Sequence, residues 1–225
     1  MVSQELTEDD ILIVLGDVVG YGAEPELCVQ WVRERKARVI LGNHEACLLG
    51  KMPLSWFNPA AAQAIMWTKE HLSRASLSFL EGLPSSLTFP GYLCVHGSPR
   101  EPTEEYIVDP WQAREIFEER EDFSLCFFGH THVAEGYLWR KDRVRRVSFL
   151  EGGTISLEPE FRYLINCGSV GQPRDGNPQA SFGLFFVEEG RIEVRRIEYD
   201  VEAAMRKILD AGLPEVLAYR LGVGR

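Results

Sequence analysis

The sequence ILIVLGDVVGYG, residues 11–22, is an uninterrupted apolar run that passes into a glycine and an aspartate. β-Branched residues supply most of the run, which is typical of a strand buried on both faces of a sheet. Open α/β sheets bind ligands in the crevice beyond the carboxyl ends of their strands, and Asp17 follows such an end here. The stretch therefore predicts a buried strand of an α/β sheet with a functional aspartate at the edge of that sheet.

Four of the five histidines lie in a similar context. An apolar run passes into a glycine or small-residue loop at Gly-Asn-His (42–44), Val-His-Gly (95–97) and Gly-His-Thr-His (129–132). Because strand ends at one sheet edge are neighbours, these side chains are expected to converge on Asp17. Imidazole and carboxylate groups suit first-row divalent ions. The candidate metal ligands are Asp17, Asn43, His96, His130 and His132.

Each candidate also has a structural explanation when it is taken alone. A glycine followed by an aspartate usually makes a turn, Asn43 could cap a helix, and a single histidine could be hydrogen-bonded in the core. The occurrence of all the segments in one chain favours the metal site. His71 carries no such motif and is expected on the surface.

Composition narrows the class of protein. The chain of 225 residues has 45% apolar or aromatic residues, enough for the core of a single domain over residues 1–225. Its net charge of −10 disfavours stable binding to nucleic acid or to anionic lipid. Five cysteines without a C-x-x-C pair indicate buried thiols in a reducing compartment. With neither a leader nor a long apolar run, we expect a cytoplasmic protein without a membrane segment.

The hydrophobic pattern predicts alternating strands and helices first and antiparallel strands later. The predicted strands are 11–15, 38–41, 92–95, 125–128, 134–139, 145–150, 162–166, 182–187 and 191–199. The predicted helices are 24–36, 58–72, 76–83, 110–119 and 201–209, with a short helix at the C-terminus. A Glu-Glu-Gly turn at 188–190 predicts antiparallel pairing of the last two strands. The result is an α/β fold with a mixed sheet or two stacked sheets.

These motifs resemble those of the calcineurin-like metallophosphoesterases. The resemblance rests on Gly-Asp-Val-Val-Gly (16–20), Gly-Asn-His-Glu (42–45), Val-His-Gly (95–97) and Gly-His-Thr-His (129–132), in family order over nearly the whole chain. The glycine-rich segment 168–176 is similar to that of the small bacterial and archaeal phosphodiesterase-like branch. The resemblance implies a four-layer αββα sandwich of two mixed β-sheets flanked by helices. It also implies two divalent metal ions, with manganese expected first and iron, zinc or nickel as alternatives.

The resemblance also implies a role for each candidate ligand. Asp17 is similar to the carboxylate that bridges both metal ions. The second ion would be completed by Asn43, His96 and His130, while His132 belongs to the first ion.

Two further side chains are expected to act on the substrate. By resemblance, His44 is a general acid that protonates the leaving oxygen rather than a metal ligand. Arg174 lies in the glycine-rich loop and is a candidate for binding substrate phosphate, against the alternative of a turn held by contact with Asp175. Arg100 is expected to be a solvated loop residue. Three large aromatic side chains are expected in the core, although they could also form an apolar wall beside a base or aryl leaving group. They are Tyr21, Trp56 and Phe57.

The sequence departs from the family at its beginning. Family members open with a strand that ends in an Asp-x-His motif, which completes the first metal site, whereas residues 1–10 contain no histidine and no apolar run. We therefore expect an N-terminally incomplete domain without the first strand and helix, with one well-formed metal site and one poor one. A start site assigned too late is the favoured explanation. The alternatives are a degenerate paralogue and association with another chain, including a homo-oligomer.

The resulting hypothesis is a metal-dependent phosphoesterase that hydrolyses phosphomonoesters or phosphodiesters through a metal-bound hydroxide. The substrate would be a small molecule, a nucleotide or a phosphoprotein. The alternative is a catalytically impaired or silent metal-binding or regulatory paralogue. A serine hydrolase is disfavoured, because the chain has no G-x-S-x-G motif.

Overall fold

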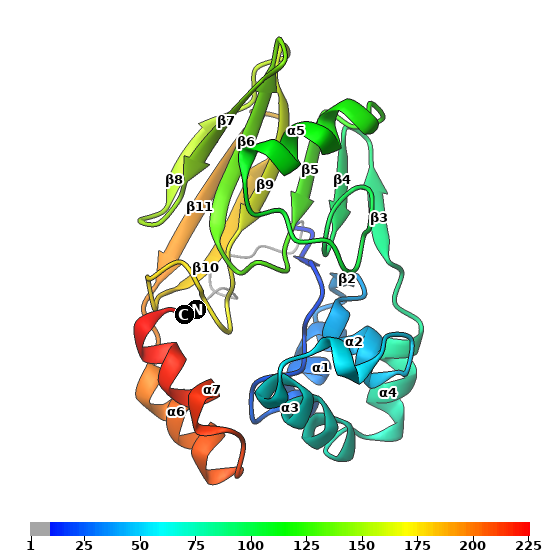
Figure 1. The fold of residues 1–225 in the computed structure, drawn as a ribbon, viewed down its shortest axis with the longest axis vertical. Coiled ribbons are helices and arrows are strands. Elements are labelled where there is room, and N and C mark those ends of the chain that lie inside the picture. The colour runs from blue at the N-terminus through cyan, green and yellow to red at the C-terminus, as the bar shows by residue number, and fades with distance from the viewer. Residues whose placement is uncertain (1–9) are drawn as a thin grey trace.

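The largest sheet has six strands in the order β3-β4-β5-β9-β6-β7 (Figure 1) in this computed structural model, which describes residues 10–225. Its strands are β3 (Ser86–Phe89), β4 (Tyr92–Val95), β5 (Leu125–Phe128), β6 (Ala134–Arg140), β7 (Arg143–Ser148) and β9 (Arg162–Cys167). The central strands β4, β5 and β9 run parallel, so their carboxyl ends reach the same edge. That edge carries His96, directly after β4, and the loop with His130 and His132, directly after β5.

The remaining strands form two smaller ladders. One is antiparallel and consists of β10 (Ala180–Phe186), β11 (Arg191–Ile197) and β8 (Gly153–Ser156). The other is the parallel pair of β1 (Ile13–Val14) and β2 (Arg38–Val39). Side chains from both ladders share one core with the six-stranded sheet, including Ile13, Ile192, Val194, Phe127 and Ile165. The strands thus form two layers that face each other across this core.

Helices flank the strand layers. α5 (Pro110–Glu119) packs against the six-stranded sheet through a second core, which joins Ile116 and Phe117 to Phe128 and Leu164. The other elements are α1 (Pro25–Glu34), α2 (Asn43–Leu48), η2 (Leu54–Trp56), α3 (Pro59–Glu70), α4 (Arg74–Glu81), α6 (Val201–Asp210), α7 (Glu215–Tyr219) and η3 (Arg220–Val223). Helices α6 and α7 pack against α3 (Figure 1). The predicted αββα arrangement of two sheets and flanking helices is confirmed.

Helix starts follow capping chemistry that is visible in the sequence. Asn58 precedes Pro59 and accepts a hydrogen bond from Ala61 N at 3.0 Å, while Asp109 precedes Pro110 and accepts one from Gln112 N at 2.9 Å. A side chain that caps the free N–H groups fixes the first turn, and proline at the first helical position already has a helical φ. These caps explain why both predicted helix starts agree with the structure.

Several short elements differ from the prediction. The sequence pattern missed α2, β3 and β8, and it made β1 and β2 too long. All six residues of α2 are buried, although three of them are polar, so the helix has no exposed polar face and no amphipathic period to reveal it. Strand β3 exists through its antiparallel pairing with β4, which is a tertiary contact. The expected lack of an initial strand and Asp-x-His motif concerns residues 1–10, almost all of which lie outside the described residues.

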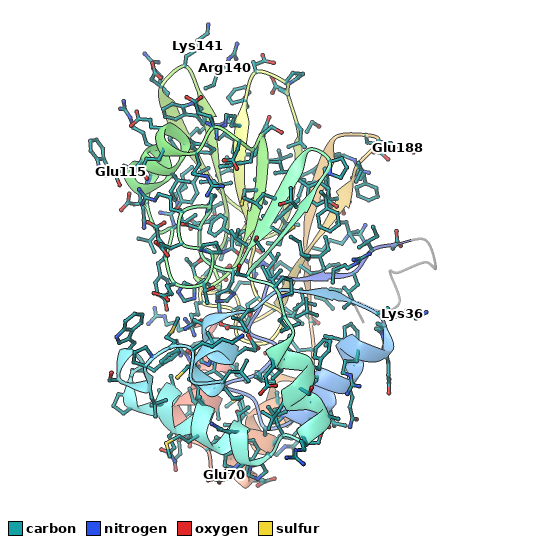
Figure 2. All side chains as sticks on the ribbon, turned by 90° about the vertical axis from the view of Figure 1, so that its right-hand side faces the viewer. Lys36, Glu70, Glu115, Arg140, Lys141 and Glu188 are labelled. Atoms are coloured by element: carbon teal, nitrogen blue, oxygen red, sulfur yellow. The ribbon has the colours of Figure 1, made fainter. Side chains whose placement is uncertain are left out.

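Charged side chains mark the outside of the molecule. Arg140 and Lys141 lie at the tip of the β6–β7 hairpin, and Glu188 lies at the turn between β10 and β11 (Figure 2). That turn joins an antiparallel pair, as predicted. Among residues 10–225, no helix has the length and apolar character that a membrane span requires.

Candidate metal centre

The loop after β1 is held by a buried carboxylate. Glu45, in α2, is fully buried and accepts hydrogen bonds from Asp17 N at 2.9 Å, Val19 N at 3.1 Å and Gly42 N at 2.9 Å. Asp17 itself has a φ of 53°, a left-handed conformation that is unfavourable for a residue with a Cβ atom. Such strain persists only where surrounding contacts enforce it. Glu45 therefore fixes the backbone that carries Asp17, a role that the sequence pattern did not indicate.

Electrostatics keep the Asp17 carboxylate ionised. Burial by itself raises its pKa, but His96 and His44 outweigh that effect and hold the pKa well below its usual range. The Asp17 Oδ1 atom accepts a hydrogen bond from His44 N at 3.1 Å, which orients the carboxylate. For Glu45, burial and the negative charge of Asp17 raise the pKa to about 7. Two buried carboxylates side by side favour a cation in their neighbourhood.

Four of the five predicted ligands form one compact cluster. His96 Nε2 lies 3.1 Å from Asn43 Oδ1, 3.1 Å from His130 Nδ1 and 3.4 Å from Asp17 Oδ2. Potential ligand atoms of Asp17, His96 and His130 all lie within 4.8 Å of one another. Residues from the ends of β1, β2, β4 and β5 thus meet at one point, as the sequence pattern predicted.

Backbone carbonyls determine which nitrogen of each imidazole faces the cluster. The paired atoms are His96 Nδ1 with Leu15 O at 2.6 Å, His130 Nε2 with Glu104 O at 3.1 Å, and His132 Nδ1 with Gln172 O at 2.7 Å. A nitrogen that faces a carbonyl must carry the proton, so the other nitrogen of a neutral ring offers a lone pair. His96 Nε2 and His130 Nδ1 then face each other and two oxygen acceptors. This set of donor atoms fits a divalent cation.

The pKa values of the imidazoles agree with this arrangement. Burial lowers the pKa of His130 and of His132 to about 3, so both rings are neutral, the form that binds metal. Burial also acts to lower the pKa of His96, but the charge and hydrogen bond of Asp17 outweigh it and the pKa is raised. A metal ion bound at His96 Nε2 would compete with a proton for the same lone pair.

His132 belongs to the same edge but not to the compact cluster. His130 and His132 have φ values of 63° and 60°, so the Gly-His-Thr-His loop concentrates left-handed backbone at the site. Among residues 10–225, the group of imidazoles and carboxylates close enough to share one ion contains His130 and not His132. Among the described residues, the candidate ligand atoms thus gather at one position, and His132 lies apart from them.

His44 is enclosed beside the cluster. Its ring lies 4.3 Å from the Tyr21 ring and 5.2 Å from the Phe57 ring, measured between centroids, and its Nδ1 atom is buried without a hydrogen-bond partner in the described structure. Gly20, with a φ of 131°, leaves room for it, since a Cβ atom there would lie 2.1 Å from His44 Nδ1. Burial lowers the pKa of His44, and the charge of Asp17 opposes this shift.

The apolar wall suggested by the sequence is only partly assembled. Tyr21 and Phe57 contact His44, whereas the side chain of Trp56 is 64% exposed and points to solvent. The sequence could not separate the three, because Tyr21 comes from a different segment than Trp56 and Phe57 and no local period relates them.

Arg174, the candidate for binding substrate phosphate, lies next to His132 and Tyr21. Its Nε and Nη2 atoms donate to Gln172 Oε1 at 3.1 and 2.7 Å, and its guanidinium lies 5.3 Å from the centre of the Tyr21 ring. Its backbone N–H donates to His132 O at 3.0 Å. The positive charge of Arg174 contributes to the lowered pKa of both His44 and His132. A fork-shaped guanidinium in this position is suited to a phosphate group.

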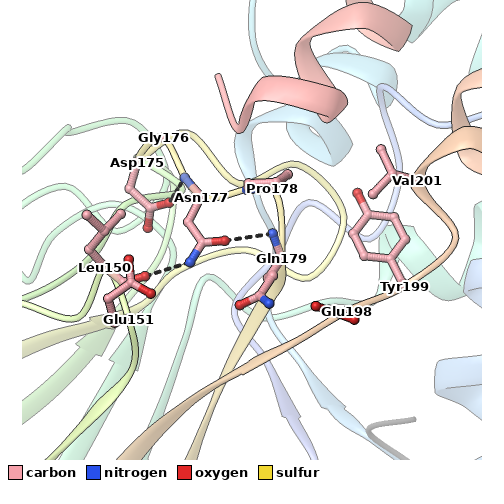
Figure 3. Close-up of a pocket in the computed structure, with 10 residues that line it drawn as sticks. All are labelled: Leu150, Glu151, Asp175, Gly176, Asn177, Pro178, Gln179, Glu198, Tyr199 and Val201. Carbon is pink, nitrogen blue, oxygen red and sulfur yellow. Dashed lines mark hydrogen bonds between the residues drawn. The ribbon is translucent and has the colours of Figure 1, made fainter.

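A separate cavity lies behind the Arg174 loop. It has a volume of about 550 Å³ and is lined by Leu150, Glu151, Asp175, Gly176, Asn177, Pro178, Gln179, Glu198, Tyr199 and Val201 (Figure 3). Asp175 accepts a hydrogen bond from Ala134 N at 3.0 Å and forms a buried ion pair with Arg196. The alternative of a turn held by a contact between Arg174 and Asp175 is therefore wrong. None of the predicted metal ligands lines this cavity.

The remaining candidates lie outside the cluster. Arg100 forms ion pairs with Glu105 and Glu119, so it braces its loop instead of being freely solvated as expected. His71 is exposed, as expected, and stacks on Trp67 at 3.7 Å between ring centroids. The five cysteines are free thiols; Cys47, Cys94 and Cys126 are buried, Cys167 is half-buried and Cys28 is exposed.

Comparison with known proteins agrees with this geometry. The family model for calcineurin-like phosphoesterases matches residues 2–134. The uncharacterized protein MJ0912 of Methanocaldococcus jannaschii is 37% identical over 223 residues, which span 95% of this chain and 86% of that protein. The crystal structure of a metallophosphoesterase from Sphaerobacter thermophilus superimposes with a TM-score of 0.86 at 38% identity, covering 100% of this chain and 92% of that one. The hypothetical protein PH1004 from Pyrococcus horikoshii shares the fold, with a TM-score of 0.78, 17% identity and coverage of 100% and 89%.

The chain belongs to the calcineurin-like phosphoesterase family. As a member of this metal-dependent family, it is a hydrolase that acts on phosphoric esters.

Proposed function

We propose that the protein hydrolyses phosphomonoesters or phosphodiesters by attack of activated water on phosphorus. The observation that supports this is the meeting of His96 Nε2, His130 Nδ1 and Asn43 Oδ1 with the Asp17 carboxylate, all within hydrogen-bonding or ion-pair distance. Divalent ions bound there supply Lewis-acid polarisation of the phosphoryl group and lower the pKa of water. Manganese is the first choice, with iron, zinc or nickel as alternatives.

The ligands divide between two positions in this proposal. Asp17, Asn43, His96 and His130 would hold one ion. His132, together with Asp17, would contribute to a second and weaker position.

His44 is the proposed general acid. Its Nδ1 atom is enclosed against Gly20, which leaves Nε2 as the nitrogen that can exchange a proton with the leaving oxygen. Tyr21 and Phe57 pack against the ring, and the charge of Asp17 opposes part of the lowering of the His44 pKa that burial causes.

Arg174 is the proposed contact for the phosphate group. Gln172 holds one side of its guanidinium and the Tyr21 ring lies beneath it, so the remaining N–H groups are presented in a fixed direction. A preoriented guanidinium loses little entropy when it binds an anion.

The proposal also covers the domain organisation, the cellular compartment and the class of substrate. We infer a single domain that acts in the cytoplasm on a small molecule, a nucleotide or a phosphoprotein. A net charge of −10 means that binding of such anions depends on the bound ions and on local cations such as Arg174.

Hydrolysis of bis(p-nitrophenyl) phosphate by the metal-stripped chain, with and without Mn²⁺, tests the proposed function. The expected result is turnover that depends on Mn²⁺ and is lost in Asp17→Asn. Asp142→Asn, at an exposed turn far from the site, is the matched control and should keep full activity. If the unmodified chain binds Mn²⁺ but does not hydrolyse the substrate, the protein is instead the silent metal-binding paralogue.

A further inference from the structure

An aromatic ring covers one of the proposed metal ligands. The ring centroids of Tyr106 and His130 lie 3.7 Å apart, with 31° between the ring planes. Even so, 47% of Tyr106 is exposed. Since one face of the ring lies on His130, the exposed surface belongs to its other face and its edge. Solvent-exposed aromatic surface directly beside a buried ligand cluster is a place where a ligand can bind.

The loop that carries Tyr106 is rigidly braced. The carboxylate of Glu105 accepts hydrogen bonds from the Ser98 hydroxyl and the Arg100 guanidinium. The backbone N–H groups of His96 and Gly97 both donate to Pro102 O, at 3.0 and 2.6 Å. On the other side of Tyr106, Ile107 is completely buried. The ring is therefore held in place before any ligand arrives, which reduces the entropy lost on binding.

Tyr106 and Arg174 both border the Gly-His-Thr-His loop, since the Tyr106 ring lies on His130 and the Arg174 backbone N–H donates to His132 O. Burial raises the pKa of Tyr106, and the charge and hydrogen bonding of the Arg174 guanidinium oppose part of that rise. Tyr21, which lies beneath the Arg174 guanidinium, contributes to the raised pKa of the Tyr106 hydroxyl. A cation suited to phosphate thus lies next to an exposed aromatic face.

We propose that Tyr106 determines specificity by stacking on a planar aromatic group attached to the substrate phosphate, either a nucleobase or an aryl ring. The inference rests on the proposed function, because Arg174 and the metal cluster must position the phosphate. Stacking of a base on an aromatic side chain contributes roughly 5- to 150-fold in affinity. Phosphate esters with an aromatic group are therefore preferred over alkyl and sugar phosphates of the same charge.

Binding of phosphonates to the Mn²⁺-loaded full chain, measured by calorimetry, tests this preference without requiring turnover. The nucleobase arm compares phosphonate analogues of AMP and ribose 5-phosphate, and the aryl arm compares benzylphosphonate with propylphosphonate. We expect the aromatic ligand of at least one arm to bind roughly 10-fold more tightly than its partner. The arm that shows the preference identifies the source of the aromatic group.

Three variants separate stacking from a purely structural role. Tyr106→Leu should remove the preference, whereas Tyr106→Phe, which retains the ring, should preserve it. Trp111→Leu is the matched control, because Trp111 is 69% exposed on α5 and its indole donates to Glu115 outside the site. A structural defect in Tyr106→Leu would weaken both ligands of a pair equally and leave their ratio unchanged.

Two results would overturn the inference. One is equal affinity within both pairs in the unmodified chain, or no binding at all. The other is a preference that persists in Tyr106→Leu. Hydrolysis of bis(p-nitrophenyl) phosphate by the same preparations reports the proposed function separately. Turnover without an aromatic preference refutes only the inference, while a preference without turnover refutes only the proposed function.

Discussion

Replacing Glu45 with glutamine should strongly destabilise the protein. The two carboxylate oxygens of Glu45 accept three backbone hydrogen bonds, and a glutamine side chain has only one acceptor oxygen. At least one buried N–H group is then left unpaired, and the new amide N–H₂ group faces another donor. Each unsatisfied buried donor costs about 1–3 kcal/mol.

The net effect follows from two opposing contributions. The unpaired backbone N–H group and the amide N–H₂ group that faces it together cost about 2–6 kcal/mol. Removal of a buried charge offsets part of this cost, since burial raises the pKa of Glu45 to about 7. We expect a net loss of about 2–4 kcal/mol in the free energy of unfolding. For a chain of this size, that corresponds to a fall in Tm of roughly 5–15 °C.

Thermal unfolding of the metal-free chain, followed by calorimetry in the presence of a chelator, measures this change. Glu26→Gln is the matched control, because Glu26 also accepts several hydrogen bonds, from Ser73, Ser76 and Gln30, but at the solvent-accessible surface. Water can replace a lost partner there, so Glu26→Gln should cost less than about 1 kcal/mol. If the two variants have the same Tm, the buried-clamp explanation for the Asp17 loop is refuted.

Three further predictions concern stability and reactivity. Both central residues of the β6–β7 turn are left-handed, with φ values of 48° at Lys141 and 59° at Asp142, and Asn-Gly is the pair that prefers this turn. The double change Lys141→Asn and Asp142→Gly should therefore raise Tm by roughly 2–4 °C in a thermal melt. An unchanged or lower Tm would contradict this prediction. Mn²⁺ at a hundred times its Kd should stabilise the chain by about 2.7 kcal/mol, seen as a rise in Tm that His96→Gln abolishes; an equal rise in that variant would place the ion elsewhere. Burial raises the pKa of Cys94 and of Cys167 to about 12, so at pH 8 only about one thiol in ten thousand is ionised and neither should react with a disulfide reagent until denaturant is added.

The predicted and observed sites agree where the side chain follows a strand directly. His96 and His130 come immediately after β4 and β5 or one residue later, and parallel strands bring such positions to one edge. Asp17 and Asn43 lie a few residues beyond the ends of β1 and β2, and Asn43 is already the first residue of α2. The sequence was also sufficient for helix starts with a local cap, such as Asn58, since the capping residue and its donor are three positions apart.

The structure was needed wherever partners lie far apart in the chain. Glu45 clamps Asp17 from 28 positions away, and Tyr106 covers His130 from a separate loop. No local period or motif relates such pairs, because their contact exists only after the loops are folded together. For the same reason, the sequence suggested that Asp175 could contact Arg174, whereas folding pairs Asp175 with Arg196.

The sequence by itself determined the types of the candidate ligands, their order along the chain and the sheet edge that gathers them, because strand periodicity is a local property. Tertiary structure alone decided which imidazole nitrogen faces the cluster, since distant backbone carbonyls such as Leu15 O fix the orientation and tautomer of each ring. Metal binding depends on lone pairs that meet at one point, and that convergence is a property of the folded chain.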